Sequence, residues 1–305
     1  MKKCTGSLLL PLLLSGGIIG VSQNYFYNDN YLDPEWLWET GISLGAMNGF
    51  TDLGGKKESF RSIIQDGTIA SSRLHAAWYT NLLYQYTLGV RLEAGWGSIY
   101  ANDHLIKSPD QESINRFRRN LSVRTRIKEI QLLGELYPLS LLQGEASVAL
   151  LYPYLLGGLS LFNFSPEAQL GNQWIPLAPL RTEGQGFIEY PERRIYPLTQ
   201  IAFPVGLGCR LDLSPRFHLR LEALHRILQT DYLDDVSTNY IDPLLFNKYL
   251  DPVQSELARK LYNRHKEIDP LAREEINGMR GNANKKDAYF SLDLKLGWII
   301  NRTRR

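Results

Sequence analysis

The chain has 305 residues, of which 44% are hydrophobic and 22% are charged, and its mean hydropathy is −0.25. Beyond the N-terminal segment it contains no run of about 18 apolar residues, which argues against a helical membrane protein. A transmembrane β-barrel remains compatible with this composition, because only every second residue of its strands must be apolar.

The N-terminal segment predicts export. Lys2 and Lys3 form a basic start, residues 8–19 form an apolar stretch, and residues 20–22 form a small-x-small cleavage site. We therefore expect a cleaved signal peptide at 1–22 and one outer-membrane β-barrel domain at 23–305. An uncleaved anchor is the alternative, but Pro11 argues against a long helix.

Cleavage changes what charge and cysteine content imply. The mature chain would keep 32 basic and 32 acidic residues, so its charge balance predicts no nucleic-acid partner. Cys4 would be removed and only Cys209 would remain, which excludes an internal disulfide.

The first expected strand carries apolar or small residues at every second position from Trp36 to Ala46. In the segment 86–100 the alternation is complete. Successive side chains of a strand point to opposite faces, so one row can meet lipid while the other points inward. The outward row there is Leu88, Val90, Leu92, Ala94 and Trp96, and the inward row is Arg91, Glu93, Gly95 and Gly97.

The segment 118–136 starts with a similar pattern. Its expected outward row runs from Leu121 to Ile127, which places Arg124 and Arg126 inside the barrel. The apolar face switches near Glu129, and this indicates either a β-bulge or a strand that emerges from the bilayer.

Three later segments alternate again, with apolar rows that start at Ile201, Phe217 and Phe290. Their opposite rows carry Arg210 and Asp212, then Arg220 and Glu222, then Asp293 and Lys295. The expected strands are 36–50, 73–83, 86–100, 118–136, 145–163, 197–213, 216–229 and 287–300.

The links between these strands are alternately short and long, and the long ones are 51–72, 101–117, 164–196 and 230–286. This order predicts an all-β, eight-stranded antiparallel transmembrane β-barrel in the outer membrane, with long extracellular loops and periplasmic termini. A soluble β-sandwich is the alternative, because periodicity alone does not tell which row faces inward. The export signal and the loop asymmetry favour the membrane.

The longest loop predicts short helices over the outer mouth. Asp251 resembles an N-cap, followed by a proline at the first helical position and by a capping-box glutamine, Gln254. Asp269 and Pro270 predict a second short helix that ends at Gly278.

The interior of an eight-stranded barrel is just wide enough for side chains, so no open channel is expected. Charges shielded from water require partners, and a paired network is a simpler interpretation than a catalytic cluster. The charged residues expected to form this lumen network are Arg91, Glu93, Arg124, Arg126, Arg210, Asp212, Arg220, Glu222, Asp293 and Lys295.

Asp231, Asp234 and Asp235 concentrate three carboxylates at the start of the last long loop. Calcium binding is conceivable, but the spacing and the turn glycine of a calcium loop are missing. We favour hydrogen bonding within the loop, and we expect no metal and no other cofactor. The five histidines show no helical metal pair and no nucleophile motif, so the sequence predicts no enzyme.

The segments that link the strands resemble a Bacteroidota family of outer-membrane barrels, the domain-of-unknown-function family DUF6089. Two matching segments are distinctive, namely residues 182–186 (Thr182, Glu183, Gly184, Gln185 and Gly186) and residues 231–240. The matching stretches span almost the whole mature chain, at 41–55, 120–130, 153–166, 176–186, 201–210, 230–243 and 280–290.

That family includes the barrel component of the type IX, or Por, secretion system, in which the barrel is associated with a periplasmic ring of a lipoprotein and its partner. The resemblance implies a barrel that anchors or stabilises such a ring, with no inherited catalytic residue and with outer-membrane lipid as the other partner. Two alternatives stay open: a lipid-modifying or small-ligand activity at the rim, and a passive structural role in the envelope.

The distinctive segments also have a physical interpretation. Glycine permits backbone angles that other residues avoid, which suits Gly184 and Gly186 to a compact loop. Arg181 and Glu183 are expected to pair within it. Thr230 and Asp234 are expected to cap local turns through side-chain bonds to the backbone.

Overall fold

The computed structural model of the chain describes residues 31–32, 34–53, 72–105, 116–143, 151–273 and 276–304. The expected signal peptide and its cleavage site lie outside these described residues. In the described ranges, no helix is long and apolar enough to cross a bilayer.

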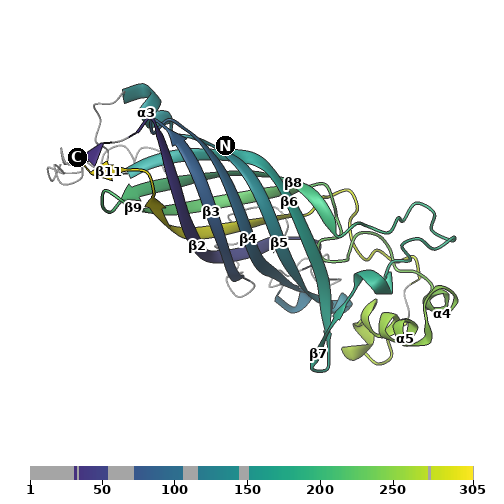
Figure 1. Cartoon of the computed structure of the whole chain (residues 1–305). Helices are drawn as coiled ribbons and strands as arrows, with labels where there is room; N and C mark the ends of the chain where they lie inside the picture. The colour runs from purple at the N-terminus through teal and green to yellow at the C-terminus, as the bar shows by residue number, and fades with distance from the viewer. Residues whose placement is uncertain are drawn as a thin grey trace, which may run out of the picture.

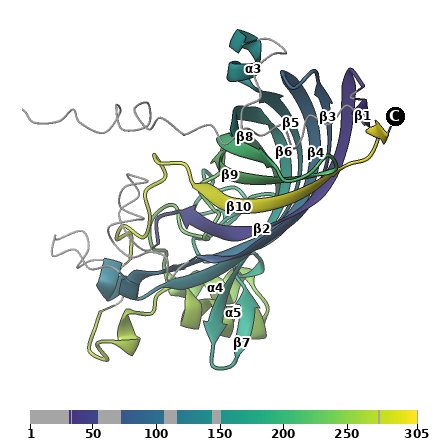
Figure 2. The same cartoon turned by 90° about the vertical axis from the view of Figure 1, so that its left-hand side faces the viewer.

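Eight long antiparallel strands close into a barrel (Figures 1 and 2). Each barrel strand pairs with the next one along the chain, and the last pairs with the first. The predicted eight-stranded antiparallel barrel is therefore confirmed. Its strands are β2 (Trp36–Phe50), β3 (Arg73–Tyr84), β4 (Leu88–Asn102), β5 (Ser122–Leu136), β6 (Leu151–Leu170), β8 (Thr199–Asp212), β9 (Phe217–Leu228) and β10 (Ala288–Ile299).

The largest difference from the expected strand ends is at β6, which continues to Leu170 instead of ending at residue 163. Residues 167–170 pair with the short strand β7 (Gln173–Pro176), so a hairpin extends the wall beyond the barrel. In this extension the outward row is polar, with Ser165, Glu167 and Gln169, whereas Phe164, Pro166 and Ala168 continue the buried row. The loss of the outward apolar row hid the extension from the sequence analysis. The expected start at residue 145 lies outside the described residues.

Two of the three predicted short links are confirmed, whereas the link between β5 and β6, expected at 137–144, contains a helix and its residues 144–150 lie outside the described ranges. Residues 85–87 and 213–216 form tight links at one end, where α3 (Pro138–Gln143) also lies in the link between β5 and β6. At this end β1 (Tyr31–Leu32) pairs with β11 (Thr303–Arg304) and joins the two ends of the described chain. Figure 1 shows the C-terminus and α3 at this short-link end, opposite the helices of the long loops.

The long loops form a cap at the other end of the barrel. It contains α4 (Phe246–Tyr249), α5 (Pro252–Leu261) and four short 3-10 helices (Asp103–Leu105, Ala178–Leu180, Pro243–Leu245 and His265–Glu267) among the described residues. The predicted N-cap of α5 is confirmed, because the Asp251 carboxylate accepts hydrogen bonds from the backbone N–H groups of Val253 (2.9 Å) and Gln254 (3.0 Å).

The second predicted helix, from residue 269 to 278, is wrong for the part that is described. A turn covers residues 270–271, and residues 276–278 are not helical. The backbone N–H of Asn277 donates to the carbonyl of Tyr240, and the N–H of Tyr240 donates to the carbonyl of Gly278. These bonds to a neighbouring segment replace the hydrogen bonds that a helix would make within itself.

The apolar row of the barrel faces outward. Trp96, Ile130 and Leu207 are 56%, 57% and 61% exposed, and similar side chains surround the barrel in a continuous band. The charged row lies inside instead. A soluble sandwich would reverse this arrangement, so that alternative is wrong and the barrel has the surface of a transmembrane protein.

The prediction for the first half of β5 is also wrong. Val123, Thr125 and Ile127 are buried in the barrel, whereas Arg124 and Arg126 point outward. Residues 122–136 pair with β4 without interruption, so no bulge is present and the faces never switch. The outward row simply becomes polar from Lys128 toward the cap, as expected for a strand that emerges from the bilayer.

Candidate functional site

Eight charged side chains fill the middle of the barrel, and we call them the lumen network. Four are cationic and four are carboxylates, and all are at most 2% exposed. Their formal charges therefore cancel. The network consists of Arg91, Arg210, Arg220 and Lys295 with Glu39, Glu93, Glu135 and Glu222.

Each cation of the network contacts at least one carboxylate from another strand. Arg91 donates two parallel hydrogen bonds to Glu222, from Nη1 (2.8 Å) and Nη2 (3.0 Å). Its Nη1 also lies 3.1 Å from Glu135. Lys295 Nζ lies 2.5 Å from Glu93 and 2.9 Å from Glu222. Charge-assisted and bidentate bonds of this kind offset the desolvation of buried ions.

Arg220 and Arg210 complete the network toward the short-link end. Arg220 donates to Glu39 and, at 2.8 Å, to Glu135, while Arg210 Nη1 donates to Glu39 at 2.5 Å. Arg210 Nε also donates at 2.7 Å to Asp212, whose side chain is 20% exposed. Asp212 therefore lies at the edge of the network rather than within it.

Aromatic side chains fill the space around the charges. The Tyr79 ring lies under three of the cations, with centroid distances of 5.7 Å to Arg91, 5.5 Å to Arg220 and 5.6 Å to Lys295. The Tyr154 hydroxyl donates to Glu222 at 2.9 Å. Charges and rings together occupy the interior, which agrees with the limited internal width of eight strands.

Sequence analysis missed Glu39 and Glu135. In β2, Trp36 and Trp38 point outward, so Glu39, which follows Trp38, falls on the inward row. The alternation of that strand therefore contained the signal for an inward carboxylate. Glu135 was hidden by the incorrect assignment of the faces of β5. The structure places it on the same inward row as Glu129.

A second buried cluster lies between the lumen network and the cap. His75 Nδ1 lies 2.6 Å from one oxygen of Asp293, and the Ser291 hydroxyl donates to the other at 2.6 Å. Arg226 donates to Glu129 at 2.7 Å. Serine and histidine thus both bind the carboxylate rather than each other, which is not the nucleophile–base arrangement that acyl transfer requires.

Arg124 and Arg126 do not belong to the lumen. Both contact Glu167 on the outer face of β6, and their side chains are 30% and 62% exposed. The expectation that they point inward is wrong, because the residues opposite them, from Val123 to Ile127, are the ones that pack inside.

In the cap, Glu183 joins its own loop to the last long loop. Its carboxylate accepts hydrogen bonds from the backbone N–H groups of Ser237 and Thr238, both at 2.9 Å, and from Arg280 Nη1 at 2.8 Å. Glu183 is fully buried, and its ionic partner is Arg280 rather than the expected Arg181. The Thr182–Gly186 segment therefore holds the last long loop in place.

The glycines of this segment have the left-handed backbone that was expected, with φ of 73° at Gly184 and 79° at Gly186. The N–H of Gly186 donates to the carbonyl of Arg193, and the Gln185 side chain accepts from the N–H of Glu183 at 3.2 Å. Backbone geometry thus closes the segment into a compact turn.

The carboxylates of residues 231–235 serve the loop as well. Asp234 accepts from the backbone N–H groups of Leu53 and Val236, both at 3.0 Å, and the Thr230 hydroxyl accepts from Tyr232 at 3.1 Å. The predicted turn-capping roles of Thr230 and Asp234 are confirmed. Asp231 is buried beside them, and no group of three or more metal-binding side chains occurs in the described ranges.

Asp235 is the most perturbed acid of the cap. It accepts hydrogen bonds from the hydroxyls of Thr182 (2.5 Å) and Tyr196 (2.6 Å), and Arg280 Nη2 lies 4.0 Å away. Burial is the largest influence and raises the pKa of Asp235 to about 6, although these three partners act in the opposite direction.

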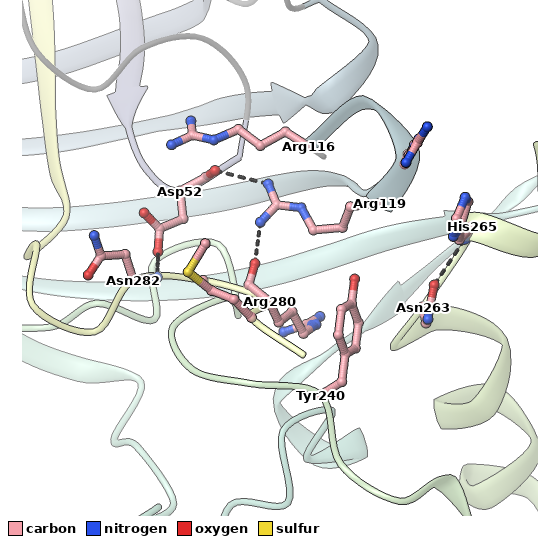
Figure 3. Close-up of a pocket in the computed structure, with 11 residues that line it drawn as sticks. Asp52, Arg116, Arg119, Tyr240, Asn263, His265, Arg280 and Asn282 are labelled. Carbon is pink, nitrogen blue, oxygen red and sulfur yellow. Dashed lines mark hydrogen bonds between the residues drawn. The ribbon is translucent and has the colours of Figure 1, made fainter. Parts of the chain in front are cut away.

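The cap also contains a pocket of about 260 Å³ (Figure 3). Arg119 crosses it and is held by Asp103 (2.8 Å) and by the backbone carbonyls of Asp52 (3.0 Å) and Arg280. Four arginines and one carboxylate occur among its described lining residues, so the pocket suits an anion. Sequence analysis missed it because these residues come from separate loops.

No known family model matches the chain, and no curated protein matches it in sequence. Some solved structures are similar to the chain at low identity. Neisserial surface protein A has 8% identity and a TM-score of 0.37 over 87% of this chain and 97% of its own. Ail of Yersinia pestis, in complex with the heparin analogue sucrose octasulfate, has 8% identity and a TM-score of 0.34 over 86% and 99%.

OprG, an outer-membrane protein of Pseudomonas aeruginosa, has 8% identity and a TM-score of 0.34 over 87% of this chain and 95% of its own. These values are too low to bear on function. The description of the barrel rests on its own strand pairing.

Proposed function

We propose that this chain is a non-enzymatic outer-membrane barrel of the DUF6089 family that anchors or stabilises a periplasmic ring of the type IX secretion system. The observation that carries the proposal is the neutral, tightly paired lumen network. A filled lumen offers no path for a solute, so the function is assigned to the ends of the barrel.

The short-link end has features that support contact with a partner. The β1–β11 pair joins the two ends of the described chain. Arg302, which precedes β11, donates to the carbonyl of Pro215 in one tight link and to the hydroxyl of Tyr86 in another. These bonds hold three segments together in one ordered surface. Such a surface favours binding because little free energy is lost to ordering its residues when a partner associates.

A pull-down from native membranes tests the proposal. An affinity tag inserted after Leu271, which is 91% exposed in the cap, leaves the short-link end untouched. We expect the tagged barrel to recover ring components, and we expect Arg302→Ala to reduce that recovery. The matched control is Arg304→Ala, which removes an exposed arginine from β11.

Each variant is first checked for a shift in gel mobility between unheated and boiled samples, which reports the folded barrel. Failure of the unaltered, folded barrel to recover any ring component would contradict the proposal. Equal losses with Arg302→Ala and Arg304→Ala would contradict the assignment of the ordered surface.

A second candidate is a small-ligand activity at the rim, which is favoured by the arginine-lined pocket of the cap. Deletion of the gene separates the two candidates. A change in lipopolysaccharide structure with normal secretion would favour the rim activity, whereas loss of secretion with unchanged lipid would favour the ring.

A further inference from the structure

A groove of about 430 Å³ lies on the outer wall of the barrel and extends across β4, β5, β6 and β8. It occurs where the small side chain of Ala94 stands in the outward row of β4, next to Ile130 of β5 in the strand register. The outward side chains around it are Ala94, Trp96, Lys128, Ile130, Leu161, Asn163 and Thr199.

The apolar part of the groove belongs to the band that faces lipid. Trp96, Ile130 and Leu161 are each 54–57% exposed. Lys128 follows Ile130 on the outward row of β5, so the groove passes from apolar to cationic toward the cap. A ligand that matches both parts needs hydrocarbon at one end and negative charge at the other.

The cationic part continues along β5. Arg126 and Arg124 are the next two outward residues after Lys128. Consecutive outward residues of a strand are about 6.6 Å apart, so the three cations extend over about 13 Å. The Arg126 side chain is 62% exposed.

Arg124 and Arg126 are held in place by contacts with neighbouring strands. Both contact Glu167, whose side chain is only 2% exposed, and Arg124 Nη2 lies 2.7 Å from it. The Arg124 guanidinium also lies 3.9 Å from the ring of Trp174 on β7. One carboxylate between two guanidinium groups leaves one positive charge, and Lys128 adds a second at a separate position.

We propose that the groove and this cationic row bind a phosphorylated glycolipid with several acyl chains. The two separated positive positions match two phosphates, which a phospholipid with one phosphate does not supply. Four strands are about 14 Å wide, which exceeds what one acyl chain needs. The assignment of this site to the outer leaflet rests on the proposed function. If the long loops are extracellular, the cationic row on the cap side of the barrel lies at the outer leaflet.

The test is a titration of the purified full-length barrel, in detergent, with bisphosphorylated lipid A, followed by native mass spectrometry. We expect Lys128→Gln together with Arg126→Gln to weaken binding about tenfold, which is about 1.4 kcal/mol. Arg124 still neutralises Glu167 in this variant. Ala94→Phe fills the groove, and we expect a similar loss.

Two control variants make the same chemical changes elsewhere. Lys286→Gln removes an exposed charge from the cap, and Ala46→Phe enlarges an exposed outward residue of β2, the strand opposite β6 in the barrel. Both are expected to bind lipid A normally. Every variant is checked for the heat-dependent gel shift, and Lys128→Gln alone, at an exposed position, serves if the double variant does not fold.

Equal binding by the groove variants and the controls would overturn the proposal. So would equal affinity for phosphatidylglycerol, or displacement of the lipid by inorganic phosphate alone. Tighter binding of bisphosphorylated than of monophosphorylated lipid A would support it. The measurement needs no ring protein, so its failure and the failure of the ring proposal are separate results.

Discussion

Arg220 on β9 donates a hydrogen bond of 2.8 Å to Glu135 on β5, across the lumen of the barrel. Two other strands, β6 and β8, separate β5 and β9 in the wall on one side. The bond therefore ties opposite walls together, and it does so without exposure of either side chain to solvent.

Arg220→Leu tests what this bond contributes. The change leaves Glu39 and Glu135 buried with fewer partners, and breaking a buried ion pair costs about 3–5 kcal/mol. We expect a loss of that size in the free energy of unfolding, measured with urea in detergent by the heat-dependent gel shift. Adding Glu135→Leu should recover part of the loss, since the two residues are coupled. A purely additive double variant would contradict the coupling.

Permeability tests the filled lumen. Liposomes that contain the unaltered barrel are expected not to swell in arabinose, because the network side chains are at most 2% exposed. The charge-balanced pair Arg91→Ala and Glu222→Ala removes two of these side chains, and we expect it to increase leakage of small ions. Rapid swelling with the unaltered barrel would show that the lumen is an open channel.

Glu183→Gln tests the cap. The change removes the ion pair with Arg280 and weakens the bonds to Ser237 and Thr238. We expect proteases to cleave the long loops at least tenfold faster while the barrel keeps its gel shift, because the barrel strands do not depend on this contact. The control is Glu192→Gln, at a glutamate that is 66% exposed. Equal cleavage of the two variants would count against the role of Glu183.

The raised pKa of Asp235 predicts how the cap responds to pH. Its pKa is about 6 in the folded cap, against about 4 for an ordinary aspartate. The folded cap therefore binds more protons at Asp235 between pH 4 and 6, so the contribution of Asp235 to the stability of the cap is fully present below pH 4 and is lost as pH rises through 6. The difference is about 3 kcal/mol at one unit of pKa per 1.36 kcal/mol.

Hydrogen exchange of the cap amides at pH 4 and pH 7, corrected for intrinsic exchange rates, measures this effect. Asp235→Asn cannot ionise, and it should remove the difference between the two pH values. The matched control is Asp242→Asn, which lies in the same loop. Unchanged pH dependence in Asp235→Asn would assign the effect to another group.

How much of this could be predicted depends on the kind of contact. The alternation of β4, β8, β9 and β10 placed Arg91, Arg220 and Lys295 inside, because a strand has only two faces and lipid accepts only one of them. It failed on β5. There the outward row leaves the bilayer at Lys128, and the cationic half of the strand then resembles an inward face.

The sequence by itself determined the strands, their order and the end of the barrel at which the long loops gather, since all of these follow from local periodicity and link length. Only the tertiary structure decided which charges meet. Glu39 and Glu135 reach Arg220 across the lumen, Glu183 selects Arg280 over its neighbour Arg181, and the groove depends on four strands at once. The physical reason is that such pairings depend on the closure of the barrel and on the folding of its loops. Neither of these produces a periodic pattern in the amino-acid sequence.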